Sequence, residues 1–92
     1  MTAKPSKSKA TLSILLQDSL EALPEVIEYR RRHTDCPIYF IGLTAIDRDT
    51  KGRNWTCRDT CAGFPRQVYG AARRRLDALR ETYDLGHAAL AN

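Results

Sequence analysis

Hydrophobic and polar positions alternate in the first apolar segment of the chain. Ala10, Leu12, Ile14 and Leu16 occupy every second position, which is the period of a half-buried β-strand. The competing interpretation is a helix, because the leucines at 12, 15, 16, 20 and 23 also have helical spacing. We expect a strand here because period two favours it.

A helix is predicted after this strand. Asp18 and Glu21 have the spacing of a capping box, and Pro24 suits the first turn of a helix. Arg30, Arg31 and Arg32 lie where cations favour the carboxyl end of the helix dipole. The pattern therefore predicts a firm helix over residues 24–33.

The centre of the chain has the pattern of a β-hairpin. Residues 37–46 are apolar, β-branched and aromatic, as in a central strand, and residues 54–59 alternate again. The polar, turn-forming segment between them contains Gly52. The hairpin therefore carries a long basic loop.

The last helix is predicted to run from Pro65 to about residue 83, with one continuous apolar stripe. The stripe consists of Val68, Ala72, Leu76, Leu79 and Tyr83. On the opposite side Arg66, Arg73 and Arg80 recur every seven residues. We expect Arg73 to pair with Asp77, and Arg80 with Asp84, at i,i+4 spacing.

The order βαββα predicts an α+β fold, with both helices on one face of a small antiparallel sheet. Residues 1–9 are polar and basic and are predicted to form a flexible tail. Residues 10–92 have room for one domain and no second. The longest uncharged stretch has eleven residues, whereas a membrane-spanning helix needs about 20, so we expect no membrane association.

The cysteines and histidines allow one metal hypothesis. His33, Cys36, Cys57 and Cys61 form two pairs with zinc-ligand spacing. Cys57 and Cys61 are about 13 Å apart along a strand at ~3.3 Å per residue, so four ligands meet only if the strand breaks. The odd number of cysteines favours a reduced, cytosolic protein, in which a Cys36–Cys61 disulfide is also disfavoured. We therefore expect no metal and no cofactor.

No catalytic arrangement is recognisable. The chain has two histidines, no Ser/His/Asp or Cys/His pattern of known spacing, and no glycine-rich phosphate loop. Asp47 and Asp49 flank Arg48 in a segment where turn formation explains them. We expect a protein that is not an enzyme and has no small-molecule substrate.

The basic residues are the remaining signal for function. The net charge is +4, residues 48–80 hold nine basic and three acidic side chains, and eleven of the fifteen basic residues are arginine. Guanidinium groups bind phosphates and carboxylates bidentately, which suits a recognition surface. Trp55 and Tyr69 are the nearest aromatic residues, and core packing is the favoured role of Trp55. The predicted contact residues are Arg48, Lys51, Arg53, Arg66, Arg74 and Arg75, followed by Arg30, Arg31 and Arg32.

The stretches PIYFIGLTAIDRDTKGRNWTCRDTCAGF and RQVYGAARRRLDALRETY, together with the size, make the chain resemble the small phage-encoded anti-CRISPR proteins that inhibit type I-F surveillance complexes. The resemblance spans essentially the full length. These inhibitors share no common fold and no catalytic signature, so no residue role is transferred by position. The resemblance implies stoichiometric binding to a Cas protein–guide RNA complex in the cytoplasm of an infected bacterium, which keeps target DNA from being recognised or paired.

Two alternatives stay open at this point. The arginines would also serve a small regulator that binds free nucleic acid, whereas direct contact with guide-RNA phosphates belongs to the inhibitor hypothesis itself. The cysteine pairs leave a zinc-stabilised binding module as the third hypothesis.

Overall fold

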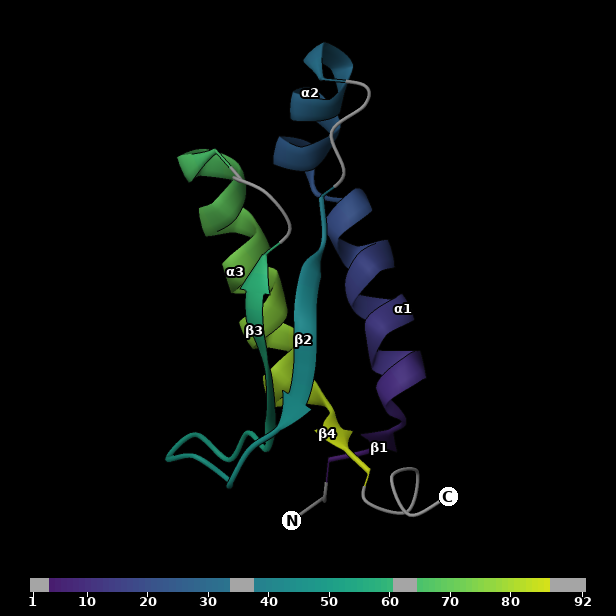
Figure 1. Cartoon of the computed structure of the whole chain (residues 1–92), viewed down its shortest axis with the longest axis vertical. Helices are drawn as coiled ribbons and strands as arrows, with labels where there is room; N and C mark the ends of the chain where they lie inside the picture. Colours follow the sequence, from purple (N-terminus) through teal and green to yellow (C-terminus); the bar gives the residue numbers. More distant parts are fainter. Residues whose placement is uncertain (1–3, 34–37, 61–64, 87–92) are drawn as a thin grey trace.

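Three helices and two small sheets make up the residues that the computed structural model describes, which are 4–33, 38–60 and 65–86. The elements in chain order are β1 (Ser6–Lys7), α1 (Lys9–Glu21), α2 (Pro24–Arg32), β2 (Phe40–Ala45), β3 (Trp55–Thr60), α3 (Arg66–Thr82) and β4 (Asp84–Leu85). Strands β2 and β3 are antiparallel, whereas β1 and β4 form a short parallel pair at the base of the molecule (Figure 1). The predicted α+β class is confirmed.

The segment predicted as the first strand is helix α1, so that prediction was wrong. Leu12, Leu16 and Leu20, spaced by four residues, are 0%, 3% and 0% exposed, whereas Ile14 is 61% exposed. A strand would have placed Ile14 on the same face as Leu12 and Leu16. The burial follows the helical spacing because leucines at i and i+4 share one face of a helix.

The start of α1 also corrects the predicted tail boundary. The Ser8 hydroxyl accepts a hydrogen bond from the backbone N–H of Thr11 (3.1 Å), so Ser8 is the N-cap and the helix begins at Lys9. Strand β1 pairs with β4 through Asp84 N–H to Pro5 O and Gly86 N–H to Lys7 O, both 3.0 Å. Residues 4–9 are therefore part of the folded body.

Helix α2 agrees with its prediction within one residue. Pro24 occupies its first turn, where a missing N–H costs no helical hydrogen bond, and the three arginines occupy its last turn. The capping-box interpretation of Asp18 was wrong, because Asp18 lies inside α1 and the N-cap residue of α2 is Leu23.

The predicted hairpin is present, with a change of side-chain direction in the middle of β2. The register runs from Phe40 opposite Thr60 to Ala45 opposite Trp55. Ile38 and Leu43 are both buried although five residues separate them, and Ile41 is 43% exposed. A regular strand alternates with period two, so the alternation must break between them. Gly42, at φ +72°, supplies the break, because this conformation is readily available only to glycine.

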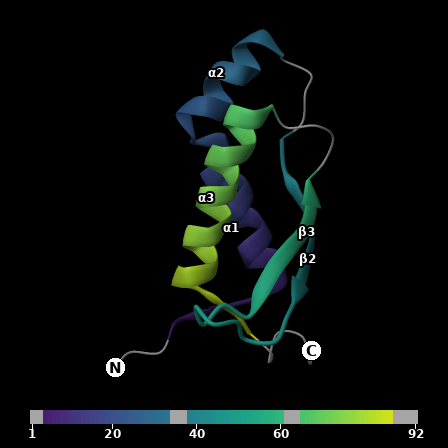
Figure 2. The ribbon, with the colours of Figure 1, turned by 90° about the vertical axis from the view of Figure 1, so that its left-hand side faces the viewer.

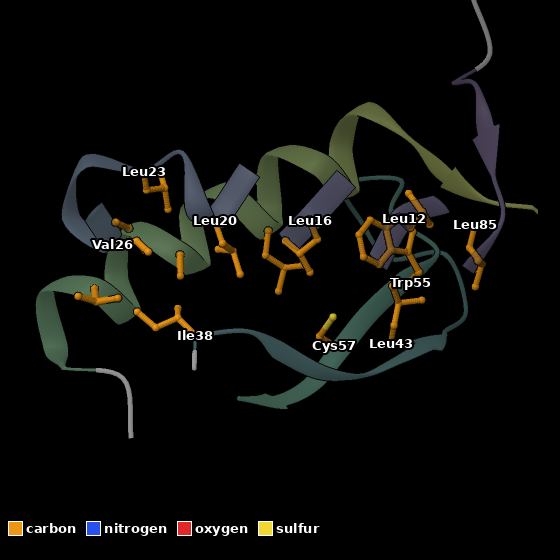
Figure 3. Packing of buried hydrophobic residues seen from close by; sticks show 14 residues of the cluster. Leu12, Leu16, Leu20, Leu23, Val26, Ile38, Leu43, Trp55, Cys57 and Leu85 are labelled. Atoms are coloured by element: carbon orange, nitrogen blue, oxygen red, sulfur yellow. The ribbon is translucent and has the colours of Figure 1, made fainter. Parts of the chain in front are cut away.

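The helices cover one face of the hairpin. Figure 2 shows α1 and α3 on the same side of β2 and β3. The predicted pair of helices was residues 24–33 and 65–83, so α1 takes the place expected for α2, which packs against α3 and α1. The core fills the space between these layers (Figure 3), and its largest fully buried side chain is Trp55. The indole N–H of Trp55 donates to the carbonyl oxygen of Tyr83 (2.9 Å), so its polar atom is satisfied.

Candidate partner-binding surface

Helix α3 turns one side to the core and an arginine-rich side to solvent. Val68, Ala72 and Leu76 of the predicted stripe are buried, and Leu79 and Tyr83 pack partly buried against the core. The stripe prediction is confirmed. This packing fixes the direction in which the remaining α3 side chains project.

Four arginines occupy the part of α3 that precedes its first carboxylate, Asp77. Arg66, Arg74 and Arg75 are exposed and Arg73 is half-buried. Within residues 4–33, 38–60 and 65–86, none of these four guanidinium groups forms an ion pair. We call Arg66, Arg73, Arg74 and Arg75 the α3 arginine surface.

The position of Arg66 is unfavourable for the helix itself. It is the first residue of α3, whose first turn contains no acidic residue and whose N-cap, Pro65, provides no side-chain hydrogen bond. The amino end of a helix carries a partial positive charge, so a cation there is repelled by the helix dipole. An anion from outside the chain would remove this repulsion.

The α3 arginine surface borders two concavities. A hollow of about 260 Å³ is lined by Arg74 and Arg75 together with Leu23, Glu25, Ala71 and Ala78. A larger groove of about 860 Å³ lies between α2 and the start of α3. The groove is lined by Pro24, Glu25, Glu28, Tyr29, Arg32, His33, Pro65, Arg66, Gln67 and Val68. Both concavities offer space for partner side chains next to unneutralised guanidinium groups.

Arg53, a predicted contact residue, is instead a structural cation. Its side chain is 17% exposed, and its Nε lies 2.8 Å from Asp49 Oδ2. Hydrogen bonds to Asp49 from the backbone and side chain of Arg53 and the backbone of Lys51 lower the pKa of Asp49 to about 2, against the opposing effect of burial. Arg53 therefore holds the hairpin loop together.

Arg80 lies in the core, and its predicted pairing with Asp84 was wrong. The residue is 5% exposed, and its Nε donates to the carbonyl oxygen of Trp55 at 2.7 Å. Its Nη1 lies 3.0 Å from Asp77 and its Nη2 lies 3.6 Å from Asp49. Asp77 is thus paired with Arg80 and, at 3.6 Å, with Arg53, so the predicted Arg73–Asp77 pair was wrong as well.

Arg48 and the arginines at the end of α2 also have carboxylate partners within the chain. Arg48 is 52% exposed and pairs with Asp84 at 3.0 Å. Arg30 pairs with Glu21 at 3.0 Å, and Arg31 and Arg32 each lie 3.5 Å from Glu28. Some of the predicted contact arginines therefore pair with carboxylates of the same chain, and the others belong to the α3 arginine surface. The remaining predicted contact residue, Lys51, is exposed at the hairpin tip.

Half of the possible zinc set falls inside the described residues. His33 is exposed, with its Nδ1 3.1 Å from the carbonyl oxygen of Tyr29. Cys57 is buried, and burial raises the pKa of its thiol to about 11, although the charges of Arg73 and Arg80 act in the opposite direction. Cys36 and Cys61 lie outside the described residues. The residues that are described contain no group of three or more metal-ligating side chains.

Two basic residues that were not among the predicted contact residues, Arg58 and Lys4, also lie at or near the protein surface. Arg58 is exposed, and a Cβ atom on Gly42 would lie 3.1 Å from its Nε, so Arg58 crosses the open face of the hairpin. Lys4 donates to the carbonyl oxygens of Gly52 (2.7 Å) and Arg80 (3.1 Å). Gly42, which lies opposite Arg58, is a sequence feature that could have indicated the position of Arg58. No local sequence pattern predicts the contacts of Lys4, because its partners are distant in sequence.

No protein-family model matches the chain, and no curated protein or solved structure is significantly similar to it. Among the described helices, none is long and apolar enough to cross a membrane.

Proposed function

We propose that the protein is a non-enzymatic inhibitor that binds a type I-F CRISPR-Cas surveillance complex through the α3 arginine surface. Bound there, it would block target DNA from being recognised by the complex or from pairing with the guide RNA. The single observation that supports this proposal is the α3 arginine surface itself, whose guanidinium groups form no ion pair within the described residues.

The physical argument concerns the cost of leaving these charges together. Four like charges within ten residues repel one another, and Arg66 is also repelled by the helix dipole. Elsewhere the chain provides carboxylates for buried arginines such as Arg80 and for exposed ones such as Arg31. An anionic partner would compensate these four charges, which form no ion pair within residues 4–33, 38–60 and 65–86.

Tyr69 adds a feature typical of protein interfaces. It lies on α3, is 42% exposed and lines a hollow with Arg73 and Arg58. Tyrosine and arginine dominate the residues that contribute most to binding at protein–protein interfaces. This supports docking on a Cas protein subunit of the ribonucleoprotein.

The test is size-exclusion chromatography of the protein with a purified type I-F complex, followed by a target-DNA binding assay. We expect co-elution and loss of DNA binding once the protein is stoichiometric with the complex. Tight binding to bare duplex or single-stranded nucleic acid, with affinity falling steeply with salt and no capture of the complex, would instead identify a nucleic-acid regulator.

A further inference from the structure

Asp84 in strand β4 is shared by two cations, Lys4 from the start of the described chain and Arg48 from the hairpin loop between β2 and β3. Its side chain is 16% exposed. Arg48 donates two hydrogen bonds to it, Nη1 to Oδ1 at 3.0 Å and Nη2 to Oδ2 at 3.2 Å. Lys4 Nζ lies 3.4 Å from the same Oδ1. One carboxylate therefore has two counter-ions.

The same two cations share a second acceptor. The carbonyl oxygen of Gly52 accepts from Arg48 Nη1 at 2.6 Å and from Lys4 Nζ at 2.7 Å. Lys4 also donates to the carbonyl oxygen of Arg80 at 3.1 Å. Lys4 thus duplicates both contacts of Arg48 and has a third of its own.

Exposure separates the two cations. The side chain of Arg48 is 52% exposed, whereas that of Lys4 is 24% exposed. Arg48 can therefore turn outward without moving the backbone, while Lys4 stays between the hairpin loop and the end of α3. Arg53, at 17% exposure, has no such freedom.

We propose that Arg48 is an exchangeable arm that leaves Asp84 to pair with an aspartate or glutamate on an acidic protein surface, while Lys4 remains as the counter-ion of Asp84. This inference rests on the proposed function and names the class of partner surface. The exchange is like for like, because the guanidinium group already binds a carboxylate through two parallel hydrogen bonds.

The exchange has a cost that Lys4 limits. The hydrogen bond from Arg48 is the largest cause of the lowered pKa of Asp84, and the charge of Lys4 acts in the same direction with a smaller effect. Without Lys4, outward movement of Arg48 would leave a largely buried carboxylate without a cation. The affinity contributed by Arg48 should therefore depend on Lys4.

The test measures this dependence by titrating a polyglutamate peptide into the native chain and five variants, which carry Arg48→Gln, Lys4→Gln or Lys9→Gln alone, or Arg48→Gln combined with either lysine change. We expect Arg48→Gln to lower the affinity about three- to fivefold in the otherwise native chain and less than about twofold in the Lys4→Gln background. Lys9→Gln is the matched background, since it removes one exposed charge that does not contact Asp84. There the loss from Arg48→Gln should remain three- to fivefold.

Unfolding of the same variants tests the redundancy without any partner. We expect Arg48→Gln to leave the urea midpoint nearly unchanged, and Arg48→Gln with Lys4→Gln to lower it by more than the sum of the single changes. An Arg48→Gln loss as large as that of Arg53→Gln would overturn the proposal.

The remaining outcomes separate this inference from the proposed function. An equal affinity loss in the native and Lys4→Gln backgrounds overturns the exchange, and a Lys4-dependent loss seen with single-stranded RNA but not with polyglutamate overturns the partner class. Capture of the surveillance complex with no effect of Arg48→Gln retains the proposed function and rejects the exchange. If the Lys4-dependent loss is seen with polyglutamate but the surveillance complex is not captured, the exchange is retained and the proposed function is rejected.

Discussion

Replacement of Arg80 by methionine should destabilise the fold more than the loss of any exposed arginine. Methionine keeps much of the aliphatic packing of the side chain but removes its donors. The carbonyl oxygen of Trp55 then loses the 2.7 Å hydrogen bond from Arg80 Nε, and Asp77 loses its 3.0 Å partner.

The magnitude follows from burial and from the partners that remain. Breaking a buried ion pair by removing one partner costs about 3–5 kcal/mol. Asp77 is 35% exposed and keeps Arg53 at 3.6 Å, and Asp49 keeps Arg53 at 2.8 Å, so the lower end applies. We expect a loss of about 3 kcal/mol, out of about 5–14 kcal/mol for a domain of this length.

Urea unfolding followed by tryptophan fluorescence measures the loss, because Trp55 lies in the affected region. With a urea dependence of about 1.5 kcal/mol/M, the midpoint should fall by about 2 M. Arg75→Met is the control and should change stability by no more than about 0.5 kcal/mol. A loss below about 1 kcal/mol for Arg80→Met would refute the claim that this buried guanidinium group holds β3 to α3.

Three further predictions concern the hairpin. Gly42→Ala should lower the free energy of unfolding by about 1–3 kcal/mol, because the alanine would have positive φ and its added Cβ would contact Arg58. Gly52→Ala should cost less, because Gly52 also has positive φ but no atom lies within 4 Å of an added Cβ. Equal losses in urea unfolding would refute the contribution of the Arg58 contact. The pKa of Asp49 is about 2 when folded and 3.8 in its ordinary state, so its stabilisation is complete above pH 4 and declines as the pH falls to 2. The unfolding midpoint of Asp49→Asn should therefore fall less steeply than that of the native chain over this window. Because burial raises the pKa of Cys57 to about 11, iodoacetamide at pH 8 should alkylate it only after unfolding, as read by peptide mass spectrometry, and rapid labelling of the native protein would contradict its burial.

The sequence predicted helices and hairpin where their signals were local. Pro24 marked the start of α2, and the stripe through Val68, Ala72 and Leu76 placed α3 correctly. Helix α1 was missed because alternation and helical spacing coexist in residues 10–16, and the exposure of Ile14 is what separates them. The competing periods fit the same short window, so tertiary packing decided the outcome.

The candidate surface was predictable from the sequence only in part, because some of the predicted contact arginines have partners that only the tertiary structure brings close. The arginines of α3 stand out because no carboxylate occurs among them until Asp77. The pairing of Arg48 with Asp84, which is 36 residues away, depends on a tertiary contact between the hairpin loop and β4. No i,i+4 rule identifies such a partner, and the same holds for the contact of Arg80 with Trp55.

The most direct test of the α3 arginine surface compares two variants that each lose two positive charges. Arg74→Gln with Arg75→Gln removes two charges that form no ion pair in the described part of the chain, whereas Lys7→Gln with Lys9→Gln removes charges from β1 and the start of α1. Binding of each variant to a purified type I-F surveillance complex is measured by calorimetry, with circular dichroism to verify folding. The account predicts a loss of at least about tenfold for the arginine variant and less than about threefold for the lysine variant. Equal losses, or unchanged binding of a folded arginine variant, would contradict it.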